Sequence, residues 1–202
     1  TDDIRVVQGI PQQDLFGYSN FEKANLLSFA AQFSYDYKSK YILNASYRAD
    51  ASSRFGKDTK WGYFPAASLA YVVSEESFLK KFSWLDLFKI RGSYGLSGTL
   101  PDNFYAPFNT WDVGTQSYDG LITAFPSFSN PLTQPNLTWN KSDQANIGAD
   151  IFMFKNRVNL TVDFYRKQTK NPILSFPFPS YTGYSQVSYN VPLKILNEVI
   201  DV

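Results

Sequence analysis

Apolar and polar side chains alternate along most of this chain with a period of two residues. In the first such run, Leu27, Phe29 and Phe33 alternate with Ser28 and Gln32. Successive side chains of a β-strand point to opposite faces, so each run predicts a strand with one apolar and one polar face. The runs last about ten residues, the length of a tilted membrane-spanning strand. The predicted strands cover residues 27–37, 41–50, 63–73, 87–97, 144–151 and 158–165, with a last strand beginning near Ile195.

The connections between these strands alternate between short and long. A turn at 38–40 is minimal, whereas long loops are predicted at about 51–62, 98–140 and 168–190. Brief turns at one end and extended loops at the other are typical of an outer-membrane β-barrel. Pro172, Pro177 and Pro179 are expected to keep the last loop out of any strand ladder, because proline has no N–H to donate. The connector 74–86 is predicted to hold one or two turns of amphipathic helix.

The pattern therefore predicts an all-β fold, namely about six or seven strands of a large antiparallel transmembrane β-barrel. Residues 1–24 are expected to form a leading loop segment with a strand at residues 4–7, and 25–202 a partial barrel domain. Tyr35, Tyr37 and Tyr41 lie beside the first turn, where an interfacial aromatic girdle is expected.

Composition narrows the possible functions. The net charge of +1 argues against a nucleic-acid partner, which needs a concentrated basic patch. Aromatic residues make up 18% of the chain, as expected for membrane-interface belts. The mean hydropathy of -0.29 is compatible with a wall that is apolar on one face only, and no run is long enough for a membrane helix.

Candidate chemistry is sparse. The chain has no cysteine and no histidine, so we expect no metal site, no cofactor and no enzyme activity. One carboxylate pair, Asp112 and Asp119, could be tested for glycoside hydrolysis, which needs two acids across a cleft. Residues 1–9 contain no apolar signal-peptide core, so either the chain is cytosolic or its N-terminal part is missing.

An ordered set of motifs resembles the SusC/RagA branch of TonB-dependent outer-membrane transporters over residues 25–169. The motifs are YRADASSRFG at 47–56, WGYFP at 61–65, SEESF at 74–78, KIRGSYGLSG at 89–98, LTW at 137–139, NIG at 146–148 and DFYRKQT at 163–169. The resemblance implies a nutrient-uptake barrel of about 22 strands in a Gram-negative outer membrane. It also implies an N-terminal plug, which is absent from this chain, and a SusD-like surface lipoprotein as partner. Energy would come from TonB through parts not in this chain, and the substrates would be oligosaccharides or peptides.

Two groups of residues are candidates for function. Polar residues of the predicted strands would face the lumen, where they line a solute path, bind the plug, or simply solvate a water-filled interior; these are Gln32, Asn44, Arg48, Arg91, Asn146, Asp150, Asn159 and Asp163. Arg48 is also two residues from Asp50 on the same face of its predicted strand, so these two residues could pair locally. Aromatic and polar residues of the long middle loop would contact the lipoprotein lid or the substrate, or pack within the loop; these are Asn103, Tyr105, Trp111, Asp112, Tyr118, Asp119, Phe125 and Phe128.

Two further alternatives remain from the sequence. The basic loop with Arg54, Lys57 and Lys60 could be solvated or could touch lipopolysaccharide phosphates, which together with outer-membrane lipid are expected neighbours of such a barrel. A secreted, soluble β-sandwich that binds carbohydrate would also show many strands, aromatic loops and few charges. The two folds differ in one respect: a sandwich buries its apolar rows in a shared core, whereas a barrel exposes them to lipid.

Overall fold

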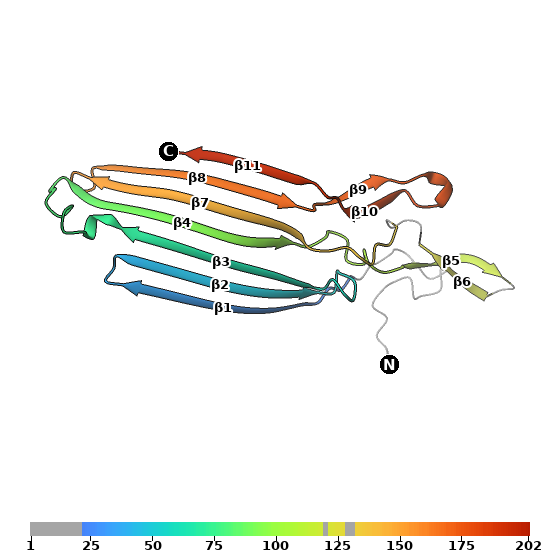
Figure 1. Ribbon diagram of the computed structural model, residues 1–202. Helices are drawn as coiled ribbons and strands as arrows, with labels where there is room; N and C mark the ends of the chain where they lie inside the picture. The colour runs from blue at the N-terminus through green and yellow to red at the C-terminus, as the bar shows by residue number, and fades with distance from the viewer. Residues whose placement is uncertain (1–21, 119–120, 128–131) are drawn as a thin grey trace, which may run out of the picture.

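A single seven-stranded antiparallel sheet forms the body of the computed structural model, which describes residues 22–118, 121–127 and 132–202. Its strands are β1 (Leu26–Tyr37), β2 (Tyr41–Ser52), β3 (Trp61–Val72), β4 (Leu85–Thr99), β7 (Asn140–Met153), β8 (Val158–Lys170) and β11 (Lys194–Asp201), side by side in chain order (Figure 1). The predicted all-β class and strand number are confirmed. The division of the chain at residue 24 stays a prediction, and the strand expected at residues 4–7 lies outside the described residues.

The connections β1–β2, β3–β4 and β7–β8 lie at one end of the sheet, called the short end, and the connections β2–β3, β4–β7 and β8–β11 lie at the other, called the long end (Figure 1). The short end holds the turn at 38–40, the connector with the 3-10 helix η3 (Val73–Glu75), and the turn at 154–157. Two hairpins project beyond the long end; they are β5 (Trp111–Tyr118) with β6 (Leu121–Pro126), and β9 (Ile173–Pro177) with β10 (Gln186–Asn190). A second 3-10 helix, η4 (Ser180–Thr182), lies between β9 and β10. The predicted alternation of short and long connections holds except at one pair, because the 12 residues between β3 and β4 outnumber the 8 between β2 and β3.

Several local predictions are wrong. The long loops are not free of strands, because each of the two longest contains a hairpin. Pro177 takes part in one of these ladders, where it pairs with Gln186 at the end of β9. Strands also run further than the alternation indicated: β2 continues to Ser52, β4 to Thr99 and β8 to Lys170. The connector after β3 forms a 3-10 turn and hydrogen-bonded turns, not an amphipathic α-helix.

The strand register sorts the side chains into two faces. Directly paired residues of neighbouring antiparallel strands lie on the same face. Asn44, Ser68, Ser93, Asn146 and Tyr165 are paired in this way across five strands and define the polar face. The opposite, apolar face contains the exposed side chains Leu27, Phe29, Leu43, Leu69, Ile90, Ile147 and Leu160, together with Val162.

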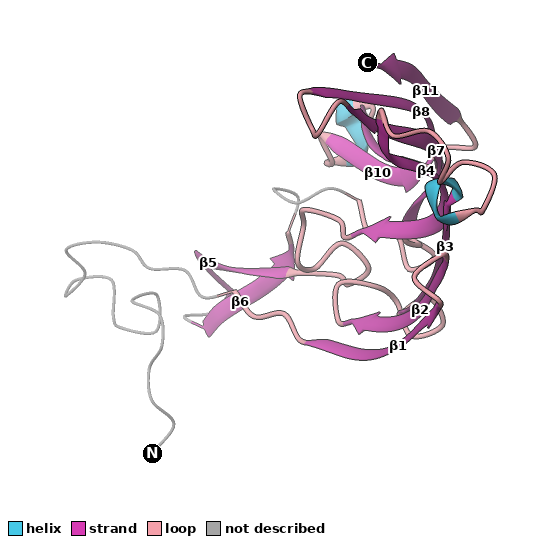
Figure 2. Cartoon of the chain, turned by 90° about the vertical axis from the view of Figure 1, so that its left-hand side faces the viewer, coloured by secondary structure: helices cyan, strands magenta, loops and turns pink. Residues whose placement is uncertain are grey.

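No second sheet covers the apolar face in the described part of the chain. The sheet is one layer deep and bends into an arc (Figure 2). Phe29, Leu69 and Ile147 remain more than half exposed, at 59%, 55% and 64%. A β-sandwich would bury these rows against a partner sheet. The soluble sandwich is therefore excluded as the arrangement of this sheet, and an apolar surrounding is what these side chains require.

Stacked aromatic rings mark both ends of the apolar face. At the short end Tyr41 stacks on Tyr71 with ring centroids 5.0 Å apart, and at the long end Trp61 stacks with Phe29 at 6.2 Å. Trp61 and Tyr71 are ten residues apart in β3, which corresponds to about 33 Å along the strand and, at a tilt of about 40°, to about 25 Å along a membrane normal. Such a spacing matches the height of the apolar band of an outer-membrane barrel. Tyr37 and Tyr41, which the sequence places in an aromatic girdle, lie at the short end of this band.

Among the described residues, no helix has the length and apolar character needed to cross a bilayer. At the short end of the sheet, Tyr71 of β3 also makes a polar contact: its hydroxyl donates to Glu76 Oε1 at 3.0 Å, and Lys40 Nζ lies 3.3 Å from Glu76 Oε2. The Tyr71 hydroxyl and the Lys40 ammonium hold the pKa of the Glu76 carboxyl below its usual value.

Candidate functional site

A charged network crosses three strands on the polar face. Arg91 of β4 donates through Nε to Asp150 of β7 at 3.2 Å and through Nη2 to Asp163 of β8 at 2.5 Å. Lys89 Nζ lies 3.7 Å from Asp150, and the Thr161 hydroxyl donates to the same carboxylate at 3.4 Å. Two cations thus face two carboxylates, so the network is neutral overall and joins β4 to β7 and β8 through side chains.

Gly148 makes this network possible. It is paired with Arg91 and with Asp163, so it lies between them in the row. A Cβ at this position would lie 2.9 Å from Arg91 Cζ and closer still to Asp163 Oδ1, so any side chain here would force the Arg91 and Asp163 side chains to move. The arginine therefore crosses over β7 only because residue 148 has no side chain.

A hollow of about 430 Å³ lies beside the network on the polar face of the sheet. Its polar lining comes from five strands and is built of small side chains and amides: Gln32, Asn44, Ser46, Ser68, Ser93 and Gln144. A second hollow of about 300 Å³ shares Asn44 and Ser93 with the first and is bounded by Arg91 and Asn146. The polar face thus offers hydrogen-bonding groups around open space, without a metal-ligand cluster among the described residues.

All eight residues predicted to face the lumen share the polar face. Gln32 and Asn44 line the larger hollow, and Arg91 and Asn146 the smaller one. Asp150 and Asp163 belong to the charged network. The remaining two lie outside both hollows: Arg48 pairs with Asp50 at 2.8 Å, as the sequence suggested, and Asn159 is exposed near the short end. Which of them contacts a solute stays a prediction.

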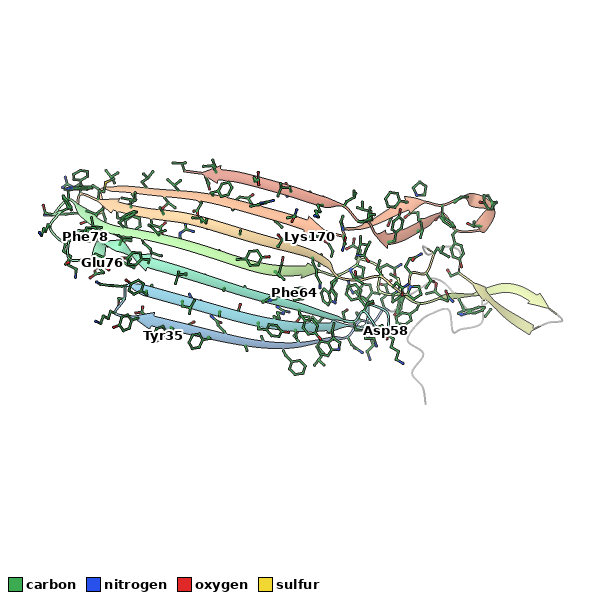
Figure 3. The ribbon with its side chains drawn as sticks, viewed as in Figure 1. Tyr35, Asp58, Phe64, Glu76, Phe78 and Lys170 are labelled. Atoms are coloured by element: carbon green, nitrogen blue, oxygen red, sulfur yellow. The ribbon has the colours of Figure 1, made fainter. Side chains whose placement is uncertain are left out.

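The long end of the sheet carries the main buried cluster of the described residues, built from Phe55, Phe64 and Trp139. The Trp139 ring lies 4.8 Å from the Phe55 ring and 5.3 Å from the Phe64 ring, and its Nε1 donates to the Lys60 carbonyl at 3.0 Å. Gly56 fits under the Pro135 carbonyl, which leaves no room for a Cβ. We call these three aromatic residues the loop core, because they fix the 53–60 loop against the start of β7. Figure 3 shows Phe64 at this junction between sheet and loops.

Arg54 packs against the long middle loop. Its guanidinium lies 3.8 Å from the centre of the Phe104 ring and donates to the Pro101 carbonyl at 2.9 Å. Arg54 is therefore held against this loop and is not free in solvent, and contact of the basic loop with lipopolysaccharide phosphates stays a prediction. Lys57 in the same loop is exposed.

The structure describes only part of the predicted loop site. The Asn103 side-chain oxygen accepts a hydrogen bond from the Tyr105 backbone N–H at 2.8 Å in a local turn. The Tyr105 hydroxyl accepts a hydrogen bond from the Lys23 backbone N–H at 3.2 Å. Trp111 opens the β5–β6 hairpin with 61% of its surface exposed. Asp112 and Tyr118 lie in β5 and Phe125 in β6, all three in the projecting hairpin; Asp119 and Phe128 lie outside the described residues. A ligand role for this group stays a prediction.

Asn190 joins the two longest loops and was missed by the sequence argument. Its side-chain oxygen accepts a hydrogen bond from the Thr138 backbone N–H at 2.7 Å. Its Nδ2 donates hydrogen bonds to the backbone carbonyls of Thr138 and Asn171, both at 3.0 Å. One amide group thus fastens the end of the middle loop to the base of the β9–β10 hairpin. Asn190 is half-buried at the end of β10, and an asparagine gives no sequence signal for a partner 52 residues away.

Replacing Asn190 by alanine is expected to free both loops, because it removes three hydrogen bonds that together contribute about 1–3 kcal/mol. Limited proteolysis should then cut within residues 98–140 about ten times faster than in the parent protein, whereas Asn197→Ala on the exposed strand β11 should change nothing. Equal cleavage rates for all three proteins would contradict a clasp at Asn190.

Comparison with known proteins gives a consistent family assignment. The family model for the β-barrel of TonB dependent receptor-like proteins matches residues 2–194. TonB-dependent receptor P39 of Formosa agariphila is 36% identical over 166 residues, which cover 82% of this chain and 16% of that protein. TonB-dependent receptor SusC of Bacteroides thetaiotaomicron is 29% identical, with 82% and 17% covered. The chain therefore spans about a sixth of the length of these curated relatives.

Solved structures agree with this assignment. The RagAB peptide importer in its closed-closed state superposes with a TM-score of 0.78 and 26% sequence identity, covering 87% of this chain and 19% of the other. The siderophore receptor PirA of Pseudomonas aeruginosa shares the fold at a TM-score of 0.59 and 14% identity. Together with the seven-stranded sheet and its two distinct faces, these matches show that the chain belongs to the TonB-dependent receptor-like β-barrel family.

Proposed function

We propose that this chain is a wall segment of an energy-coupled outer-membrane transporter that imports oligosaccharides or peptides. The observation that carries the proposal is the sheet itself: an exposed apolar face between two aromatic belts, backed by a polar face with hollows and a charged network. Only a surface with lipid on one side and water on the other suits both faces. Short turns belong at the periplasmic end of such a barrel and long loops outside the cell.

The two unpaired edges of the sheet support a larger barrel. Among the strands that the structure describes, β1 and β11 each pair on one side only, and exposed edge strands of this length invite uncontrolled association. Closure with further strands removes both edges. In the complete barrel the polar face would line the lumen, with the eight predicted residues directed at a plug or a solute.

A SusD-like lipoprotein is the proposed partner at the extracellular end. The projecting hairpins β5–β6 and β9–β10 reach furthest from the sheet, so a lid would meet them first (Figure 1). Asn103, Tyr105 and Trp111, with their neighbours in the hairpin, are the proposed contacts to lid or substrate. The energy for uptake would come from TonB, through parts outside these 202 residues. Transport involves no covalent chemistry, so we assign no catalytic residue.

Uptake by cells carrying the intact transporter tests this proposal. Two radiolabelled probes are used, a mixture of maltooligosaccharides and a mixture of oligopeptides, with and without a protonophore that abolishes the energy supply. We expect one mixture to accumulate, and accumulation to stop with the protonophore. Recovery of the protein in the outer membrane without energy-dependent uptake of either probe would refute the proposal.

The exposed Trp111 provides a sharper test of the loop site. Trp111→Ala should lower uptake about five- to tenfold at limiting substrate, because stacking on an aromatic face contributes about 1 kcal/mol or more. Phe78 is a matched control, since it is 60% exposed but lies at the short end (Figure 3). Phe78→Ala should leave uptake unchanged; equal loss in both variants would mean that Trp111 has no specific role.

A further inference from the structure

Three lysines lie side by side on the apolar face at the extracellular end of the sheet. Lys141 of β7 is paired with Lys170 of β8, and Lys170 with Lys194 of β11. Because paired residues share a face and neighbouring strands are about 4.8 Å apart, the three side chains form a row about 10 Å wide. We call it the lysine row. Figure 3 shows Lys170 at the loop end of its strand.

The charges of the lysine row are only partly compensated. Lys170 Nζ lies 2.6 Å from Asp143 Oδ1, whereas Lys141 and Lys194 form no ion pair with any carboxylate that the structure describes. Nearer the membrane centre, Arg166 pairs with Glu198 at 3.4 Å on the same face. Four cations thus face two carboxylates, a local net charge of +2. Like charges directly opposite each other in a sheet are destabilising, so this row requires an anion.

The position of the row suggests which anion. The outward rows of β7, β8 and β11 change from Ile147, Phe164 and Ile200 in the middle of the sheet to the lysine row at its extracellular end. The row therefore lies where the hydrocarbon of the outer leaflet gives way to headgroups, and lysine stems can reach along the wall to place their ammonium groups there. On β1 to β3 the same level carries stacked Phe29, Trp61 and Tyr63 instead.

We propose that the lysine row binds the phosphate groups of lipopolysaccharide in the outer leaflet. The inference rests on the proposed outer-membrane function and adds a ligand site on the outside of the wall. Charge complementarity favours this occupant, since basic pockets at membrane surfaces bind anionic headgroups and each lysine contributes about fivefold in affinity. A protein partner fits the row less well, because lysine is depleted from the cores of protein interfaces.

The test uses the intact transporter in mild detergent, with bound lipopolysaccharide counted by native mass spectrometry. The triple variant Lys141→Gln, Lys170→Gln, Lys194→Gln should bind at least about tenfold less than the parent. The control triple variant Lys38→Gln, Lys81→Gln, Lys155→Gln removes three exposed lysines at the short end and should bind like the parent. Asp143→Asn should bind more tightly, because it frees Lys170. Enzymatically dephosphorylated lipopolysaccharide is the second probe and should bind poorly to all variants.

Each other outcome overturns the inference. Equal loss in both triple variants would show a general charge effect, and undiminished binding of the dephosphorylated probe would show recognition of acyl chains alone. Loss of a co-purifying protein with unchanged lipopolysaccharide would make the row a protein-docking surface. Recovery of a folded barrel is checked by its altered gel mobility before and after boiling. A parent protein absent from the outer membrane would refute the proposed function itself, whereas a correctly located barrel with unchanged lipid binding refutes only this inference.

Discussion

Replacing Ile147 by arginine is expected to destabilise the barrel by about 2–4 kcal/mol, the cost of a cationic side chain at the middle of the lipid-facing wall. Ile147 lies at the centre of β7, is 64% exposed, and is paired with Gly92 and Phe164 on the apolar face. In the proposed barrel this exposure would be to hydrocarbon, so the arginine would have to lose its hydration or deform the bilayer. Urea titration of the barrel reconstituted in phosphatidylcholine vesicles measures the change in the free energy of unfolding.

A matched control separates lipid exposure from a general effect of added charge. Gln144 lies three residues away in β7, on the polar face, where it lines the larger hollow. Gln144→Arg should change the free energy of unfolding by less than about 0.5 kcal/mol, because its guanidinium stays in water. Equal destabilisation by the two variants would mean that the faces are not in different solvents, and the transporter proposal would lose its main support.

Alternation predicted the faces well because it reports a physical demand that acts on every residue of a strand. Leu43 and Asn44 must lie on opposite sides of the sheet wherever the strand begins, so the two faces followed without any knowledge of register. The family motifs then indicated that the two-faced strands form part of a barrel wall. Loop hairpins gave no such signal, because β5–β6 and β9–β10 lie outside the band where one side meets lipid. Pro177 was expected to keep its loop out of any strand ladder. It lies at the last position of β9, where the loss of one backbone N–H donor destabilises the ladder little.

Tertiary contacts at the long end depended on pairs that no local pattern reveals. Asn190 meets Thr138 across 52 residues, and Arg54 meets Pro101 across 47. Phe64 did leave a trace in the sequence: it is a large apolar residue in the polar row of β3, between Gly62 and Ala66. Such a break in the alternation marks a residue that packs against a loop outside the sheet. The alternation did not predict the lysine row, because Lys170 and Lys194 lie outside the strands that it predicted.

Replacing Trp139 by alanine should have the largest effect on the loops at the long end of the sheet, because it removes the central member of the loop core. Trp139 is 5% exposed, packs against Phe55 and Phe64, and donates its indole N–H to the Lys60 carbonyl. Truncation of a buried tryptophan costs about 3–5 kcal/mol. The loop core fixes loops and not the membrane-spanning ladder, so the loss should appear as local opening of residues 53–60.

Hydrogen exchange on the intact barrel measures this opening at single amides. Ser52 donates its amide to the Lys60 carbonyl at 3.2 Å, and its protection should fall about a hundredfold in Trp139→Ala, the factor that corresponds to about 3 kcal/mol. Trp139→Phe keeps most of the packing and loses only the N–H bond, so it should cost about 1 kcal/mol. Trp111→Ala removes the same side chain from an exposed position and should leave Ser52 protection unchanged, although it lowers uptake. If Trp139→Ala left Ser52 as protected as in the parent, the loop core would not be what orders the 53–60 loop.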